Sequence, residues 1–190
     1  AVIQLPLGKE SDFEGVIDLL EERAWVFPPE ELGARQEEVP IPPEMIEEVR
    51  RQRERLIEQI AEVDDEILGR YLEEEPITVD QLRAALRRAT IAGTLVPVLC
   101  GSALRNKGIQ PLLDAVVDYL PSPVDIPPIR GVNPYTDKEE PRWPDPKGPL
   151  AALAFKIVSD PYVGRLAYLR IYSGTLRNGM VVHNANRKRK

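Results

Sequence analysis

The sequence has 190 residues, of which 43% are hydrophobic and 29% are charged, proportions typical of a folded, soluble chain. It contains neither the run of about 20 apolar residues that a membrane-spanning helix requires nor a signal-peptide pattern, so no membrane partner is expected. A single cysteine excludes a disulfide framework and favours a reducing, cytoplasmic setting.

Acidic and basic residues are distributed unequally along the chain. The net charge is −6, but residues 1–120 carry 13 Lys and Arg against 25 Asp and Glu, whereas residues 121–190 carry 12 against 6. The two regions therefore have opposite signs. This asymmetry indicates either two different partners, or an acidic and a basic surface that meet the same partner.

Short strands and a long loop are predicted for the first 43 residues. The strands are expected at residues 3–5, 14–19 and 24–27. Prolines and glycines punctuate residues 28–43, so a loop is expected there, with one extended piece around Val39.

Two helices are predicted next. Between residues 44 and 72, apolar residues recur at three- and four-residue steps with almost no helix breaker, which predicts one helix on the order of 40 Å long. Pro76 ends this stretch. Thr78 and Gln81 form the capping-box pattern of a second helix, which is expected to run to about Ile91 and to end near Gly93.

An apolar run at residues 95–100 ends in a Gly-Ser-Ala sequence and a polar turn at 106–108. This order is typical of a buried parallel strand that delivers a tight loop to the carboxyl edge of a sheet, where α/β proteins bind ligands. A helix is expected from about Ile109 to Tyr119, with Pro111 in its first turn, where proline is tolerated.

The composition changes after residue 120. Residues 121–150 hold nine of the 19 prolines, so they are expected to form little regular structure and to link two domains. Beyond them, residues 151–160, 163–174 and 180–184 alternate apolar and polar side chains, with turns at Asp160 and Gly179. This pattern predicts three antiparallel strands, the first part of a barrel or sandwich.

Autonomous catalysis finds little support in the sequence. A Ser-His-Asp or Cys-His arrangement would need His183, the single histidine, which is expected to be an ordinary surface residue, and one Cys with one His cannot form the usual zinc site. The phosphate loop GxxxxGK[ST] is absent, and the DxxG string at 12–15 therefore has no such loop before it. Residues 106–108 lack the aspartate of the guanine-reading NKxD motif. No catalytic and no metal-binding residue is assigned.

An acidic stripe lies on the predicted long helix, on the face away from its apolar residues. It consists of Glu54, Glu58, Glu62 and Asp65. Like charges at such spacing cost an isolated helix a few tenths of a kcal/mol per pair. One interpretation is a solvated face on which Arg51 and Arg55 reduce the repulsion. The other is a docking surface for a basic partner, with fast and salt-sensitive association.

Three stretches, residues 3–27, 90–129 and 150–179, closely resemble bacterial translation elongation factor G, the ribosomal translocation GTPase. "PSPVDIPPI" and "DPYVGRLAYLRIYSGTL" favour this family over related translational GTPases, namely factor-G paralogues, ribosome-protection proteins and release factor three. The resemblance implies a mixed α+β and α/β internal fragment. Residues 1–93 would form the insert subdomain of the GTPase domain, 94–120 the last strand and helix of that P-loop domain, 121–150 a linker, and 151–190 the start of the β-barrel second domain.

The resemblance also implies functional residues. Ser102 and Ala103 would belong to the loop whose backbone amides read the guanine base, with Leu104 packing beside them. The full-length factor would bind GTP or GDP with Mg²⁺, whereas this fragment is expected to bind neither and to hydrolyse no GTP. Glu58, Glu62 and Asp65 would contact the basic C-terminal domain of the ribosomal stalk protein, and the basic second domain would face small-subunit rRNA. The alternative, from a different functional class, is a non-enzymatic binding module whose acidic helix binds a protein.

Overall fold

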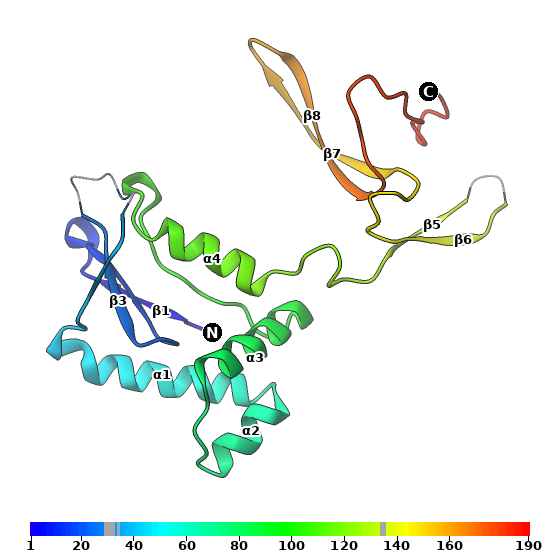
Figure 1. Ribbon diagram of the computed structural model, residues 1–190. Helices are drawn as coiled ribbons and strands as arrows, with labels where there is room; N and C mark the ends of the chain where they lie inside the picture. The colour runs from blue at the N-terminus through cyan, green and yellow to red at the C-terminus, as the bar shows by residue number, and fades with distance from the viewer. Residues whose placement is uncertain (29–32, 34, 134–135) are drawn as a thin grey trace. The chain divides into compact units, whose positions relative to one another are not determined.

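The computed structural model describes residues 1–28, 33, 35–133 and 136–190 (Figure 1). They form two compact units, residues 1–120 and 121–190. The first unit is mixed α+β and the second contains only antiparallel strands. No helix among the described residues is long and apolar enough to cross a membrane. Part of the loop predicted at 28–43 lies outside the described residues.

An antiparallel sheet with strand order β1-β2-β3-β4 forms the first layer of residues 1–120. Its strands are β1 (Gln4–Leu7), β2 (Gly15–Asp18), β3 (Arg23–Val26) and β4 (Glu37–Val39). The turn between β2 and β3 is closed by Asp18, whose Oδ1 accepts from the backbone N–H groups of Leu20 and Glu21, both at 2.8 Å. The three predicted strands and the extended piece at Val39 are confirmed, with boundaries shifted by a few residues.

Strand β2 is buried on both faces because its side chains alternate between two hydrophobic clusters. Ile17 joins the large cluster that the sheet forms with the helices, whereas its neighbour Val16 packs with Phe13 and Phe27. Both Val16 and Ile17 have 0% exposure. This arrangement places Val16 and Asp18 on one face of the sheet and Ile17 on the other.

The prediction of one long helix at 44–72 is wrong, because the helix is interrupted before Asp65. Helix α1 (Ile46–Ala61) and helix α2 (Asp65–Leu72) replace it and pack against each other. Asp64 has an extended backbone, and its Oδ1 accepts from the N–H of Ile67 at 3.2 Å, so it caps α2. The break lets Ile67 enter the core to which Ile60 also belongs. In a continuous helix, Ile67 would lie about 10 Å beyond Ile60 along the helix axis.

Asp64 joins three elements, so its replacement tests this corner of the fold. Its Oδ2 also accepts from Nε and Nη2 of Arg88, at 3.0 and 2.6 Å. We expect Asp64→Ala to lower the free energy of unfolding by about 1–3 kcal/mol, because a helix cap and an ion pair are lost. Asp64→Asn keeps the cap and should lose less than about 1 kcal/mol. Urea denaturation measures both, and equal losses would contradict the capping role.

Helices α3 (Val79–Ala92) and α4 (Ile109–Tyr119) are confirmed. Thr78 and Gln81 form the predicted capping box, and Gly93 ends α3 with a left-handed φ of 75°. On α4, Ala115 and Tyr119 are buried in the large cluster. Arg87 of α3 donates to the backbone carbonyls of Val117, Asp118 and Leu120, which ties the end of α4 to α3.

The buried parallel strand predicted at 95–100 is only partly formed. One parallel bridge joins Val98 to Val2, with N–H···O distances of 3.0 Å from Ile3 to Val98 and 2.8 Å from Val98 to Ala1. Leu95 and Leu99 contact the large cluster, whereas Val96 and Val98 are exposed. The segment is therefore buried on one face only, and no other described strand pairs with it.

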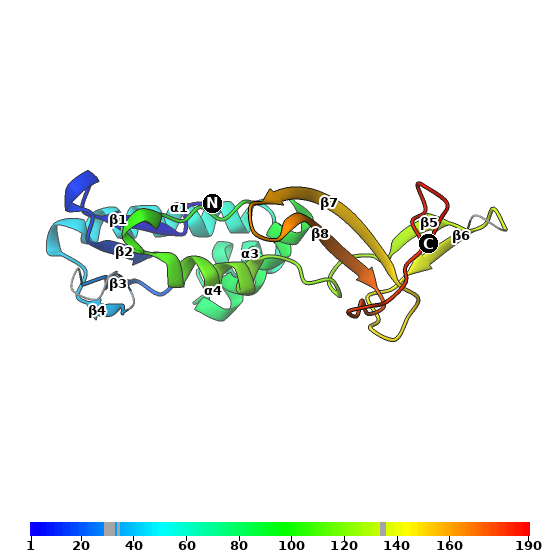
Figure 2. The same cartoon turned by 90° about the horizontal axis from the view of Figure 1, so that it is seen from above.

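Residues 121–190 form two separate hairpins. Strands β5 (Ile129–Val132) and β6 (Glu139–Arg142) lie in the stretch predicted to have little regular structure, so that prediction holds only outside these two four-residue strands. Proline is tolerated there because a two-stranded ribbon has only edge strands. Strands β7 (Ala151–Asp160) and β8 (Gly164–Ser173) confirm the predicted pair, and Figure 2 shows them as a long curved ribbon.

The turns around this ribbon follow the sequence pattern. Asp160 Oδ1 accepts from the N–H groups of Tyr162 and Val163, both at 2.8 Å, and these bonds lower the pKa of the Asp160 carboxyl. Gly179 has a φ of 77° in the predicted second turn. The third strand, expected at 180–184, is wrong: Asn184 makes one isolated bridge to Arg189, and within the described residues no strand pairs with Met180 to His183.

Candidate functional site

The loop at residues 100–108 is a tight turn held by its own backbone. Ser102 and Lys107 face each other across an antiparallel bridge, with N–H···O distances of 2.8 Å from Ser102 to Lys107 and 3.1 Å in return. Ala103–Arg105 forms a single 3-10 turn between them. Gly108 has a φ of 81°, and a Cβ there would lie 2.9 Å from the Cys100 carbonyl oxygen. Glycine therefore permits the close approach of the two ends of the loop.

Ser102 and Ala103 are the residues assigned to base reading, with Leu104 beside them, and of these three residues Ala103 and Leu104 keep their amides available. The N–H of Ser102 is used by the Lys107 carbonyl. The N–H groups of Ala103 and Leu104 begin the 3-10 turn, and no described residue accepts from either. The Leu104 side chain is 99% exposed, so the expectation that it packs beside the loop is wrong. The turn thus presents two adjacent donors in a small, accessible bend.

The loop is anchored to the 8–13 connection between β1 and β2. Lys107 Nζ donates to the Phe13 carbonyl at 2.8 Å, and Arg105 donates to the Ser11 carbonyl at 2.9 Å. On the next helix, Gln110 Nε2 donates to the Gly33 carbonyl at 2.7 Å. These contacts hold the loop against the sheet, although they join residues more than 75 positions apart.

Cys100 lies at the start of the loop, against the cluster of Val16 and Phe27. Burial raises the pKa of its thiol to about 11, from an ordinary 9.0. At pH 8 the folded chain then holds about a hundredfold less thiolate than the unfolded chain, since the two pKa values differ by about two. We expect alkylation by iodoacetamide to be slower by a similar factor in buffer than in urea. Equal rates would show that the thiol is not buried.

The acidic residues predicted to bind a partner are exposed but do not lie on one helix. Glu58 belongs to α1, Glu62 is its C-terminal cap, and Asp65 is the first residue of α2. Glu58 Oε1 accepts from the Tyr71 hydroxyl at 3.2 Å, which raises the pKa of that tyrosine. The prediction that these residues form a stripe along one straight helix is therefore wrong, because the chain changes direction at Asp64. Its residues gather instead at the corner between α1 and α2.

Among the described residues, no group of three or more His, Cys, Asp and Glu side chains could hold a metal ion. His183 is exposed, as predicted for an ordinary surface residue.

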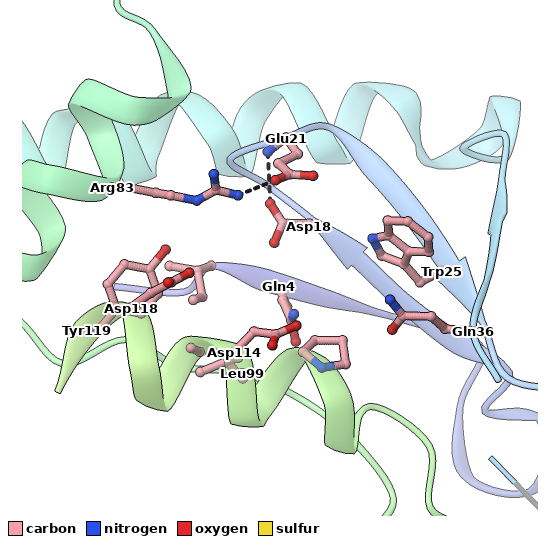
Figure 3. Close-up of a pocket in the computed structure, with 13 residues that line it drawn as sticks. Gln4, Asp18, Glu21, Trp25, Gln36, Arg83, Leu99, Asp114, Asp118 and Tyr119 are labelled. Atoms are coloured by element: carbon pink, nitrogen blue, oxygen red, sulfur yellow. Dashed lines mark hydrogen bonds and ion pairs between the residues drawn. The ribbon is translucent and has the colours of Figure 1, made fainter. Parts of the chain in front are cut away.

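A polar cavity of about 200 Å³ lies between the sheet, α3 and α4, and the sequence analysis did not identify it (Figure 3). Gln4 and Asp18 are direct cross-strand partners and line it from the sheet, with Trp25 on the same face. Asp114 and Asp118 line it from α4, and Arg83 lines it from α3. Polar residues at facing positions of otherwise apolar strands are the signal that could have located it.

Burial shapes the chemistry of this cavity. Desolvation raises the pKa of the Asp18 carboxyl, against the effect of the two backbone N–H groups that it accepts from. Burial likewise raises the pKa of Tyr119 to about 12. Arg83 forms an ion pair with Glu21 at the cavity wall. The site therefore combines one paired cation with several carboxylates.

Comparison with known proteins gives three matches. Residues 149–190 match the family model described as elongation factor G domain 2. The chain is 53% identical over 188 residues to elongation factor G of Aquifex pyrophilus, which covers 99% of this chain and 27% of that protein. A crystal structure from Thermus thermophilus superposes with a TM-score of 0.68 at 32% identity, over 94% of this chain and 24% of the other.

The chain spans about a quarter of the length of these two relatives. The family resemblance drawn from the sequence is confirmed by the alignment, which runs through both units. The match at 149–190 also includes the β7–β8 ribbon.

Proposed function

Because the chain corresponds to a segment of elongation factor G along almost its entire length, we propose that it works as part of a cytoplasmic, GTP-binding translation factor that drives movement of tRNA and mRNA on the ribosome. The observation that carries this proposal is the 53% identity over 188 residues. The rest of the factor would supply the P-loop and the magnesium ligands, since this sequence contains no GxxxxGK[ST]. The chain alone is then not a hydrolase.

The loop at 100–108 is proposed as one wall of the guanine site. Its support is the pair of available backbone donors at Ala103 and Leu104, which suit a flat base with a carbonyl acceptor. The Ser102 amide is engaged within the loop, so its role is to keep the turn closed. Bound GTP or GDP with Mg²⁺ would require the remaining walls of the pocket.

The acidic corner, comprising Glu58, Glu62 and Asp65, is proposed as the recruitment surface for the basic C-terminal domain of the ribosomal stalk protein. All three side chains are exposed, and residues 1–120 carry a large excess of acidic residues. Such a contact associates quickly and weakens with salt. The basic residues of 121–190 are proposed to face small-subunit rRNA, where phosphate contacts dominate affinity.

Charge reversal tests the recruitment surface. We expect Glu58→Lys with Glu62→Lys to weaken binding of the isolated stalk C-terminal domain at least tenfold, because two attractive charges become repulsive. Calorimetry at low and moderate salt measures this. Glu44→Lys with Glu47→Lys is the matched control: both side chains are exposed near the start of α1, away from the corner, and should change affinity less than threefold. An equal loss of affinity in the two double variants would show that net charge, and not the acidic corner, determines binding.

A second candidate function rests on the same acidic corner. Without a guanine site in the complete protein, the chain would be a binding module for a basic protein, without enzymatic activity. A related translational GTPase, such as a factor-G paralogue, a ribosome-protection protein or release factor three, would keep the nucleotide site but differ in its action on the ribosome. Ribosome-stimulated GTP hydrolysis and translocation by the full-length protein separate these functions.

A further inference from the structure

The cavity between β1, β2 and α4 carries an inference that does not depend on the proposed function. It lies among residues of the sheet, α3 and α4 and has a volume of about 200 Å³. This volume is well above what a single water molecule needs, so the space would hold several waters or one short organic molecule.

An unpartnered acceptor lies in the wall of this cavity. Gln4 is only 5% exposed, and its Oε1 has no hydrogen-bond partner among the described residues. Figure 3 shows its amide directed from β1 toward α4. Gln36, at the other end of the cavity, also has a buried Oε1 without a partner among the described residues. Buried acceptors without donors are costly, so the cavity favours a ligand that brings N–H groups.

The charges that line the cavity also favour a ligand that carries N–H groups, in particular a positively charged one. Its one cation, Arg83, is paired with Glu21. Three further carboxylates line the space: Asp18, Asp114 and Asp118. None of the three forms an ion pair with a described residue, and Asp18 Oδ1 is occupied by two backbone donors while its other oxygen points toward α4 (Figure 3). An added positive charge would offset this excess.

A compact metal ion does not fit this arrangement. Within the described residues, no three carboxylate, His or Cys side chains converge closely enough to bind a metal ion. A cation on a short chain suits it better, because Asp18 lies on β2 and the other two carboxylates lie on α4, while Trp25 and Leu99 supply apolar walls for methylene groups.

We propose that this cavity binds a primary alkylammonium group, with Gln4 and Asp18 receiving its N–H groups and Asp114 and Asp118 supplying compensating charge from α4. Two sources carry this chemistry: a free short diamine and the side chain of a lysine on another protein. Putrescine represents the first source, Nα-acetyl-lysine amide represents the second, and butane-1,4-diol serves as a neutral ligand of the same length as putrescine.

Trp25 provides the measurement. The sequence has two tryptophans, and Trp143 belongs to the other unit, so Trp143→Phe leaves Trp25, beside the cavity, as the sole tryptophan, which is excited selectively over the tyrosines. We expect a saturable fluorescence change with at least one ammonium probe and none with the diol. Response to putrescine alone assigns a free diamine, response to the lysine amide alone assigns a protein side chain, and response to both assigns the ammonium group itself.

Substitutions at the cavity complete the test. Asp114→Asn with Asp118→Asn changes two exposed side chains of α4 and should raise the dissociation constant at least tenfold. The matched pair Glu44→Gln with Glu47→Gln removes two charges away from the cavity and should change it less than twofold. Gln4→Leu removes the buried acceptor independently and should weaken binding at least fivefold. Absence of a saturable change, an equal response to the diol, or unaltered affinity in the α4 pair would overturn the proposal.

Discussion

Leu56→Ala is expected to lower the free energy of unfolding of residues 1–120 by about 2–5 kcal/mol. Leu56 lies on α1, is 1% exposed, and belongs to the cluster that joins the sheet to the helices. Truncation removes apolar surface from the core and leaves a cavity that neighbours on separate elements cannot all relax to fill. Urea denaturation followed by far-ultraviolet circular dichroism measures the change.

Leu72→Ala is the matched control for Leu56→Ala. Leu72 ends α2 and is 72% exposed, so the same truncation there should cost less than about 0.5 kcal/mol. Similar losses for the two variants would place Leu56 outside the core and contradict the packing of α1 against the sheet.

Gly108→Ala is expected to lower the free energy of unfolding by about 2–4 kcal/mol, because two costs combine. The backbone has a φ of 81°, which L side chains rarely adopt, and a Cβ would approach the Cys100 carbonyl oxygen to 2.9 Å and Gly101 Cα to 3.1 Å. Relief of this contact would separate the two ends of the loop and displace the donors of Ala103 and Leu104. Denaturation and the amide chemical shifts of residues 101–108 report the two effects.

Gly93→Ala isolates the backbone cost from the steric cost. Gly93 has a φ of 75°, but a Cβ there would meet nothing within 4 Å. This variant should therefore lose about 1 kcal/mol, the cost of the left-handed conformation alone. If both alanine variants lost the same amount, the close approach at Gly108 would be absent in solution.

Local patterns predicted much of the fold. Thr78 with Gln81 and the glycine at 93 fixed both ends of α3, because capping depends on residues three or four positions apart. The long helix failed for the opposite reason. Apolar periodicity continues through Asp64, and the break there is favoured by the cap that Asp64 forms on α2, by its ion pair with Arg88, and by the burial of Ile67 in the same cluster as Ile60. Sequence periodicity does not report these contacts.

The candidate sites likewise divide into features that the local sequence predicted and features that depend on tertiary packing. The bend at 101–104 was visible in the sequence because glycine, serine and alanine follow an apolar run. The exposure of Leu104 was not, since it depends on what lies beside the loop. The cavity was missed because Gln4, Asp18, Arg83 and Asp118 come from four elements and carry no shared motif. Only the strand register and the packing of α4 bring them together.

The contacts that anchor the 100–108 loop also set an order of events during folding. Arg105 with Ser11, Lys107 with Phe13, and Val98 with Val2 each close a chain segment of about 95 residues. Such closure carries an entropic cost of about 4 kcal/mol that grows with segment length, so these contacts form late, after the intervening hairpins and helices. The loop therefore docks against the 8–13 connection only when both ends of residues 1–120 have come together, and partial unfolding at either end of that stretch releases it.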